Sequence, residues 1–288
     1  MELFENTEET KQRIVLSASR MSDMPAFYPH EIIQETQARI DKGRLIHTLV
    51  LWTKHPVSLL KEPLNSFLTE LKKKQVQISV QLSITGMGGK SAALNGKNGV
   101  VFPERNTPSA RDALLVLPEI IRLTGDPCRI YLRIDPLVKI RDIHGKIYSN
   151  FPDFEEIMKQ AVGLGIQYFV FSFLKKGIHR KVDHRFQKAG LDILDFSKEE
   201  EYSFRKMIKI WEREYGIEIS ACCVDNFPES SCINGKRLQK THEHFYSVKL
   251  KQLRRRPRCG CTFSIDLGGW PPKKCHSGCL YCYANPLI

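Results

Sequence analysis

The stretch LIHTLVLWT, residues 45–53, is apolar almost throughout. A near-continuous apolar run of this length is typical of a parallel β-strand that is covered on both faces. Working outward, the same pattern recurs six times along the chain, at residues 14–19, 76–84, 129–135, 166–173, 217–223 and 263–267. The sequence therefore predicts seven buried, mainly parallel strands.

Helical patterns separate these strands. The predicted helices cover residues 29–42, 64–74, about 108–124, 152–162, 197–215 and 236–252. Thr107 is a candidate cap for the third, which Pro118 should bend or divide, and Ser197 with Glu200 has the spacing of a capping box. Strands joined by helical crossovers predict a repeated right-handed (β/α) unit. We expect a full or partial (β/α) barrel, with a doubly wound open sheet as the alternative.

Composition narrows the class of protein. The 288 residues contain 44 Lys and Arg against 32 Asp and Glu, a net charge of +12. No apolar run approaches the roughly 20 residues of a membrane span, and the polar N-terminus is unlike a signal peptide. We expect a cytoplasmic protein without a membrane partner, in which cysteines serve as ligands rather than disulfides. The positive charge suits a nucleic acid, a phosphorylated substrate or an anionic cofactor, but it is equally compatible with a scattered surface charge.

Five of the nine cysteines lie between residues 259 and 284. Cys275, Cys279 and Cys282 follow the spacing C-x3-C-x2-C. Three soft thiolates favour an iron–sulfur cluster, zinc or copper, and three ligands rather than four would leave one iron of a cluster open. A structural zinc ion is the alternative, because Cys259 or Cys261 could complete a set of four.

The remaining cysteines predict a second group of ligands. Cys259 and Cys261 form C-x-C, and upstream lie Cys232 and the pair Cys222 and Cys223. With one of that pair, these residues could supply four thiolates to a second cluster. The alternative is that some are ordinary buried cysteines.

In a (β/α) barrel the active face lies at the carboxyl ends of the strands. Polar residues gather at the predicted ends, namely Arg20, Asp23, Lys54, Thr85, Gly86, Arg133 and Asp135. Arg133 and Asp135 point to the same side of their strand, which in a barrel faces the interior. Burying charged side chains there costs free energy unless the charges are paired or bind a ligand. They could bind a ligand or form a structural ion pair, as could Arg20 and Asp23. Lys54 is a candidate for holding an anionic substrate group, or is a solvated lysine.

The segment CHSGCLYCYAN, residues 275–285, resembles the cluster loop of the radical S-adenosylmethionine (AdoMet) enzymes. The resemblance implies a [4Fe–4S] cluster on Cys275, Cys279 and Cys282 whose fourth iron chelates AdoMet. It further implies reductive cleavage of AdoMet to a 5′-deoxyadenosyl radical, with an electron from a ferredoxin or flavodoxin. In that superfamily the loop lies near the N-terminus. We therefore hypothesise a circular permutation in which strand 263–267 lies beside strand 14–19 and closes the barrel.

The chain as a whole is similar to the uncharacterised DUF1848 family, which shares such a C-terminal cysteine cluster. The matching stretches are LSASRMSDMPAFY (16–28), VLWTKHP (50–56), LSITG (82–86), YLRIDPL (131–137), CGCTFSIDLGGW (259–270) and CHSGCLYCYA (275–284). This similarity implies the cluster but supplies no substrate.

These patterns lead to one functional hypothesis and one alternative. We expect a radical-AdoMet-type enzyme whose domain spans residues 1–258, with residues 259–288 as a strand and cluster loop packed into it. Its expected catalytic residues are Arg133, Asp135 and Lys54, and its expected cofactor-binding residues are Tyr281, Thr85, Gly86, Arg20 and Asp23. The alternative is a nucleic-acid-binding protein with a structural zinc or iron–sulfur site, in which a basic helix at 236–258 contacts phosphates.

Overall fold

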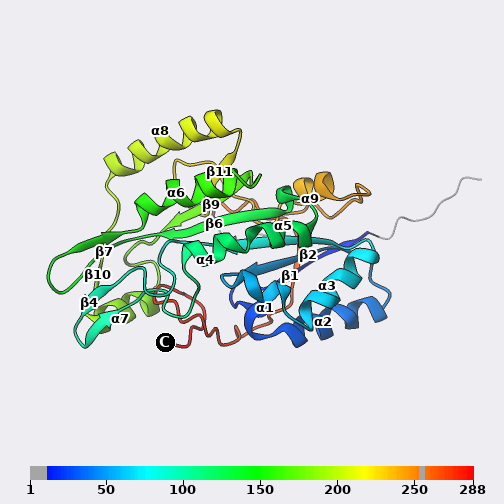
Figure 1. Cartoon of the computed structure of the whole chain (residues 1–288), viewed down its shortest axis with the longest axis horizontal. Helices are drawn as coiled ribbons and strands as arrows, with labels where there is room; N and C mark the ends of the chain where they lie inside the picture. The colour runs from blue at the N-terminus through cyan, green and yellow to red at the C-terminus, as the bar shows by residue number, and fades with distance from the viewer. Residues whose placement is uncertain (1–11, 253–256) are drawn as a thin grey trace, which may run out of the picture.

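A seven-stranded parallel sheet forms the centre of the molecule in the computed structural model, which describes residues 12–252 and 257–288 (Figure 1). Its strands are β1 (Ile14–Ala18), β2 (Ile46–Thr53), β3 (Gln77–Ser83), β6 (Ile130–Leu137), β9 (Tyr168–Phe173), β11 (Glu218–Ala221) and β12 (Ile265–Asp266). Each of the seven apolar runs contributes one strand. The predicted parallel α/β architecture is therefore confirmed.

The sheet is open. Its order is β11-β9-β6-β3-β2-β1-β12, and β12 pairs in parallel with β1 through Leu16↔Ile265 and Ser17↔Asp266. The last predicted strand thus lies beside the first, as expected. Among the described residues β11 and β12 do not pair with each other, so the prediction of a closed barrel is wrong. The order from β1 to β11 also lacks the reversal that a doubly wound sheet has.

An irregular segment explains why the sheet does not close. The free edge of β11 is occupied by residues 228–230, since Ala221 N donates to Pro228 O (2.8 Å) and Ser230 N donates to Ala221 O (3.0 Å). Gly260 N in turn donates to Ser230 O (3.1 Å). These hydrogen bonds pair backbone groups at the edge of β11. To close the barrel, β12 would have to bond to that same edge. We call this junction of residues 221–223, 228–233 and 259–262 the seam.

The helices are α1 (Met24–Phe27), α2 (Pro29–Asp41), α3 (Leu64–Lys73), α4 (Ala110–Leu115), α5 (Leu117–Thr124), α6 (Phe151–Val162), α7 (Arg180–Ala189), α8 (Lys198–Tyr215) and α9 (Gly235–Thr241). Short 3-10 turns lie at Pro56–Leu60 and Pro127–Arg129. The division near Pro118 is confirmed, but the cap of α4 is Ser109 rather than Thr107. The final helix ends at Thr241 and not near residue 252, because extended backbone at His242 buries its ring and directs Nε2 to Gln75 O (3.1 Å).

The two faces of the sheet differ in character. One face packs on α2, α3, α5, α6 and α8 through a large apolar core that includes Leu51, Val80, Leu132 and Phe171. The other face carries polar side chains and is covered by α9 and the described chain on either side of it, within residues 230–252 and 257–263. Gln81, for example, is buried and donates to Cys232 O (2.6 Å). The polar residues of this face therefore hold the cysteine-bearing segment against the sheet.

Short strands form an extension beyond the main sheet. They are β4 (Leu94–Gly96) with β5 (Gly99–Val101), and β7 (Lys139–Arg141) between β8 (Ile147–Ser149) and β10 (Asp192–Ile193). With α7 they share a second apolar core that includes Leu280 from the C-terminal cysteine loop. Figure 1 shows β4, β7, β10 and α7 together at one end of the molecule. Within the described part of the chain, no helix combines the length and apolar character that crossing a membrane requires.

Buried His47 is expected to make the folded protein less stable at acidic pH. Its Nε2 lies 2.8 Å from Tyr246 O, so Nε2 carries the proton and Nδ1 accepts from Thr48 Oγ1 at 2.6 Å. Burial, with a smaller effect of His242, lowers the pKa of His47 from 6.5 to about 4. The unfolded chain therefore binds the proton more tightly, and stability should fall by about 3 kcal/mol as the pH drops from 6.5 to 4. Urea unfolding across that range checks this, and a His47→Gln variant should show a weaker dependence.

The cap of α8 gives a smaller prediction. Ser197 Oγ accepts from Glu200 N (3.2 Å) and Glu200 accepts from Ser197 N (2.7 Å), which confirms the predicted capping box. Ser197→Ala should lower the free energy of unfolding by about 1 kcal/mol. Ser203→Ala, on an exposed turn of the same helix, is the matched control and should leave stability unchanged or slightly higher. Equal losses in both variants would contradict the role of the cap.

Candidate metal centre

The C-terminal cysteine loop is folded back on itself. Cys275 N donates to Asn285 O (2.9 Å), and Leu287 N donates to Cys275 O (2.8 Å). Cys282 N donates to Cys279 O (3.1 Å), which closes a tight turn between these two residues. The side chains of Cys275 and Cys279 are buried, while that of Cys282 is half-buried. The three thiols therefore come from one compact, sheltered loop, which we call the first thiol group.

Segments that follow several strands hold this loop in place. After β2, His55 Nε2 lies 2.9 Å from Ser277 Oγ. Tyr28, between α1 and α2, donates to Lys274 O (2.6 Å). From the extension, Arg185 on α7 donates to the carbonyl oxygens of Cys279 and Cys282. The loop is thus fixed by parts of the chain far apart in sequence.

A buried ion pair lies beside the first thiol group. Lys54 Nζ is 3.0 Å from Glu104 Oε1, and the Glu104 side chain is only 3% exposed. Thr85 Oγ1 donates to the same oxygen at 2.7 Å, and the Tyr281 hydroxyl also donates to it. Burial alone would raise the pKa of Glu104, but Lys54 and these hydroxyls outweigh it and lower that pKa. Lys54, Thr85 and Tyr281, all predicted site residues, therefore meet at one carboxylate.

Glu104 itself was not predicted. It follows Val-Val-Phe-Pro in a segment without helical or strand periodicity, and nothing local marks its carboxylate as buried. Burial lowers the pKa of Lys54, whereas Glu104 and Cys279 raise it, and the net shift is upward. Lys54 is therefore a charged group within electrostatic range of a thiol, not a solvated lysine.

The remaining predicted cysteines meet at the seam. Cys222, Cys232, Cys259 and Cys261 pack in one cluster with Tyr131. Cys222 is half-buried and Cys223 is exposed, with its Sγ 4.0 Å from that of Cys222. We call Cys222, Cys232, Cys259 and Cys261 the second thiol group.

Arg133 and Asp135 form an ion pair on β6, and the Asp135 side chain remains 21% exposed. Arg133 Nη1 also donates to Cys232 Sγ at 2.8 Å, and Asp135 accepts from Ser172. Asp135 lies within electrostatic range of Lys54, Tyr281 and Cys222. This carboxylate is therefore within electrostatic range of residues at both sites.

Among the ion pairs of the described residues, none joins Arg20 to Asp23. Asp23 accepts from Thr53 Oγ1 (3.0 Å), Lys54 N (2.7 Å) and Ala26 N (3.2 Å), so it links α1 to the end of β2. Arg20 has two buried nitrogens, Nε and Nη2, without a hydrogen-bond partner among the described residues. Asp23 thus has a clear structural role, while Arg20 has spare donors.

Gly86 is constrained by packing. Its φ is +83°, and an added Cβ would lie 2.3 Å from Asp153 Oδ2 at the start of α6. The missing side chain therefore makes room for α6. That Gly86 also lets the backbone approach AdoMet stays a prediction.

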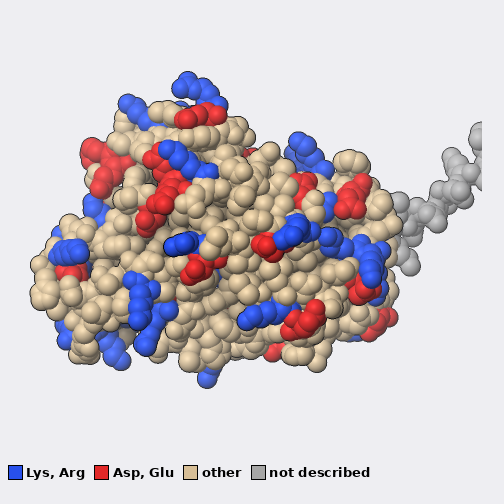
Figure 2. All heavy atoms as spheres, in the orientation of Figure 1, with Lys and Arg blue, Asp and Glu red and all other residues tan. Residues whose placement is uncertain are grey.

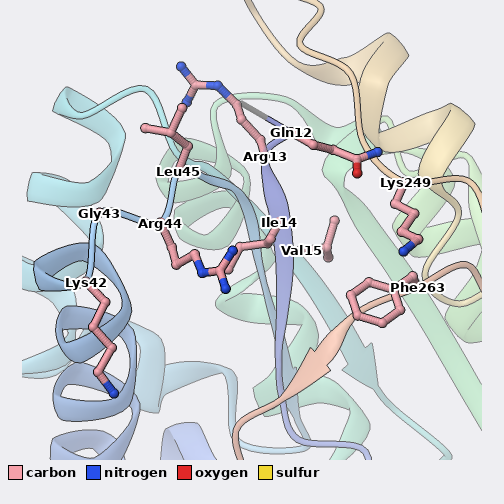
Figure 3. Close-up of a pocket in the computed structure, with 10 residues that line it drawn as sticks. All are labelled: Gln12, Arg13, Ile14, Val15, Lys42, Gly43, Arg44, Leu45, Lys249 and Phe263. Atoms are coloured by element: carbon pink, nitrogen blue, oxygen red, sulfur yellow. The ribbon is translucent and has the colours of Figure 1, made fainter. Parts of the chain in front are cut away.

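The described residues include no three His, Cys, Asp or Glu side chains arranged to hold a metal ion. A cavity of about 460 Å³ lies elsewhere, where β1 and β2 begin (Figure 3). It is lined by Arg13, Lys42, Arg44 and Lys249, with Phe263 at one side. No cysteine of either thiol group lines this cationic cavity.

Comparison with known proteins decides the family. A family model described as "Domain of unknown function (DUF1848)" matches residues 15–284. This chain belongs to the DUF1848 family. The match spans both thiol groups, so they are part of the DUF1848 domain. No curated protein matches the chain.

Solved structures add little to the DUF1848 assignment. One similar structure is that of the alpha-galactosidase from Lactobacillus brevis, which is 9% identical over 96% of this chain. The chain spans 37% of that protein, and the TM-score is 0.29. A likeness this weak carries no argument about fold or activity.

Proposed function

We propose that this DUF1848 protein is an iron–sulfur enzyme in which Cys275, Cys279 and Cys282 hold a [4Fe–4S] cluster that binds AdoMet. The observation that carries the proposal is the first thiol group itself: three thiols on one anchored loop beside the charged Lys54. When bound, such a cluster would supply one electron to the sulfonium of AdoMet and so yield a 5′-deoxyadenosyl radical. A ferredoxin or flavodoxin is the proposed electron donor.

The donor set suits a cluster. Thiolates are the ligands that hold iron–sulfur clusters, and three of them leave one iron for another ligand. A cluster distributes its thiolates over separate irons, so the thiols need not converge on one point. The cations Lys54 and Arg185 lie against the loop and offset the charge of three thiolates.

The neighbouring residues have distinct proposed tasks. Glu104 positions Lys54 and Tyr281, and so holds the loop against the end of the sheet. Asp135 faces the same region and is the proposed group for binding AdoMet or the substrate, with Arg133 fixing its orientation. The protein's own contribution is to bind, orient and exclude water around the reacting atoms.

Release of 5′-deoxyadenosine tests the proposed function. Anaerobically reconstituted protein with dithionite and AdoMet should release 5′-deoxyadenosine and methionine, measured by chromatography. Lys54→Met, Asp135→Asn and wild-type protein should be compared at matched iron content. Cluster-replete wild-type protein that leaves AdoMet intact with a range of anionic substrates would overturn the assignment as a radical enzyme.

The nucleic-acid-binding alternative relied on a predicted basic helix at residues 236–258. The observed helix, α9, ends at Thr241. The described residues after Thr241 form no helix, and Arg254, Arg255 and Arg256 lie outside the described part of the chain. Figure 2 shows Lys and Arg interspersed with Asp and Glu on the face in view. The cationic cavity of Figure 3 is the observation that still favours phosphate binding. Binding to single-stranded and duplex nucleic acid at two salt concentrations tests this alternative.

A further inference from the structure

We propose that the second thiol group binds a second iron–sulfur cluster, with Cys222, Cys232, Cys259 and Cys261 as its four ligands. The site lies in the seam, where the parallel sheet stays open between β11 and β12. This inference goes beyond the proposed function and does not need it, because none of the four residues belongs to the C-terminal loop.

The backbone of the seam brings the four cysteines together. Cys222 directly follows β11, and Cys222 N donates to Phe171 O (2.7 Å) on β9. The strand edge before it is bonded to residues 228–230, which lead into Cys232. Ser231 Oγ then donates to Gly260 O (2.7 Å), between Cys259 and Cys261. Hydrogen bonds therefore fix three distant segments at one point.

The thiols are in mutual contact and sheltered. The side chains of Cys222, Cys232, Cys259 and Cys261 pack together in one cluster. Cys232 and Cys261 are 5% and 6% exposed and pack in the same cluster as Trp52 and Tyr131. All four are reduced cysteines rather than disulfide partners. Four contiguous reduced thiols at one site match the ligand number of a cluster held entirely by protein.

Charge at the seam also points to a ligand. A cluster with four thiolates carries net negative charge, which burial makes costly unless cations lie beside it. Arg133 donates to Cys232 Sγ at 2.8 Å, and Arg20 lies within electrostatic range of Cys259 and Cys261. The guanidinium carbons of both arginines lie over the Trp52 ring, 5.2 Å and 5.7 Å from its centroid.

Arg20 supplies an independent observation. Its Nε and Nη2 are buried without a hydrogen-bond partner in the described chain, although such donors are rarely left unsatisfied. A cluster on the adjacent thiols would provide sulfur acceptors for them. A thiol sulfur is only a weak acceptor, so ordinary buried cysteines would satisfy the Arg20 donors less well than a cluster.

Iron and sulfide analysis of two complementary variants tests the inference. After anaerobic reconstitution, wild-type protein should contain about eight irons per chain, and Cys275→Ser/Cys279→Ser/Cys282→Ser should keep about four. Because the triple variant leaves the seam untouched, it remains informative even if seam variants fold poorly. Cys232→Ser/Cys261→Ser should also keep about four irons, now on the C-terminal loop.

The choice of Cys222 rather than Cys223 as the fourth ligand can be tested with a matched control. Cys222→Ala should lose the iron of the second site, whereas Cys223→Ala should keep it, since Cys222 is half-buried in the cluster with Cys232 and Cys223 is exposed. Circular dichroism of each variant shows whether the fold persists.

Three outcomes would overturn the inference: a triple variant without iron, zinc in place of iron at the seam, or iron loss in Cys223→Ala but not in Cys222→Ala. If instead the seam variant loses all of its iron while the triple variant retains it, the proposed function fails and the inference stands.

Discussion

Replacing Cys279 with serine is expected to remove the iron of the first thiol group and abolish release of 5′-deoxyadenosine. Cys279 is the central thiol of the loop, is buried, and lies within electrostatic range of Cys275, Cys282 and Lys54. A hydroxyl is a poor substitute for a soft thiolate on iron. Iron content should fall by about four per chain, and the nucleoside product should fall below detection.

The matched control for this variant is Cys128→Ser. Cys128 belongs to neither thiol group, and its Sγ lies 3.5 Å from Gln167 Oε1. Its replacement should leave iron content and product release at wild-type levels. If Cys279→Ser retained full iron and full release, the C-terminal loop would not be the cluster site.

Lys54→Met is expected to cost about 3–5 kcal/mol of folding free energy. The substitution keeps the length of the side chain but leaves Glu104 as a buried carboxylate without its cation. The hydroxyls of Thr85, Thr107 and Tyr281 would still donate to Glu104, but they do not neutralise its charge. Urea unfolding of protein prepared without iron isolates this loss from any effect on a cluster.

Two further variants show whether the loss comes from the uncompensated charge. Lys54→Met/Glu104→Gln removes both charges and should be more stable than Lys54→Met alone. Lys73→Met breaks the pair with Glu70, whose side chains are 68% and 58% exposed, and should cost less than about 1 kcal/mol. A Lys54→Met variant as stable as Lys73→Met would show that the buried pair contributes no more than a surface pair.

The main sheet could be predicted from the sequence because strands buried on both faces appear as near-continuous apolar runs. The run at 45–53 became β2, and the short run at 263–267 was correctly placed beside the first strand. Closure of the barrel was not predictable from such runs. It depends on which segment satisfies the edge of β11, and the irregular residues 228–230, which have no periodic pattern, occupy that edge.

The candidate site was predictable only in part. Cysteine spacing singled out both thiol groups, and strand ends singled out Lys54, Arg133 and Asp135. Glu104 was missed because it follows β5, whose three residues are too few to show a period. Arg185 was missed because its helix, α7, was not among the predicted helices. The basic helix at 236–258 was predicted from charge and helix-forming residues, but tertiary contacts of His242 end it early.

Electron paramagnetic resonance of the reduced protein, recorded with and without AdoMet, tests the central claim most directly. Chelation of AdoMet at the open iron should change the signal of the first cluster in wild-type protein. The Cys275→Ser/Cys279→Ser/Cys282→Ser variant should show only a signal from the seam that AdoMet leaves unchanged. A wild-type signal indifferent to saturating AdoMet would contradict the account.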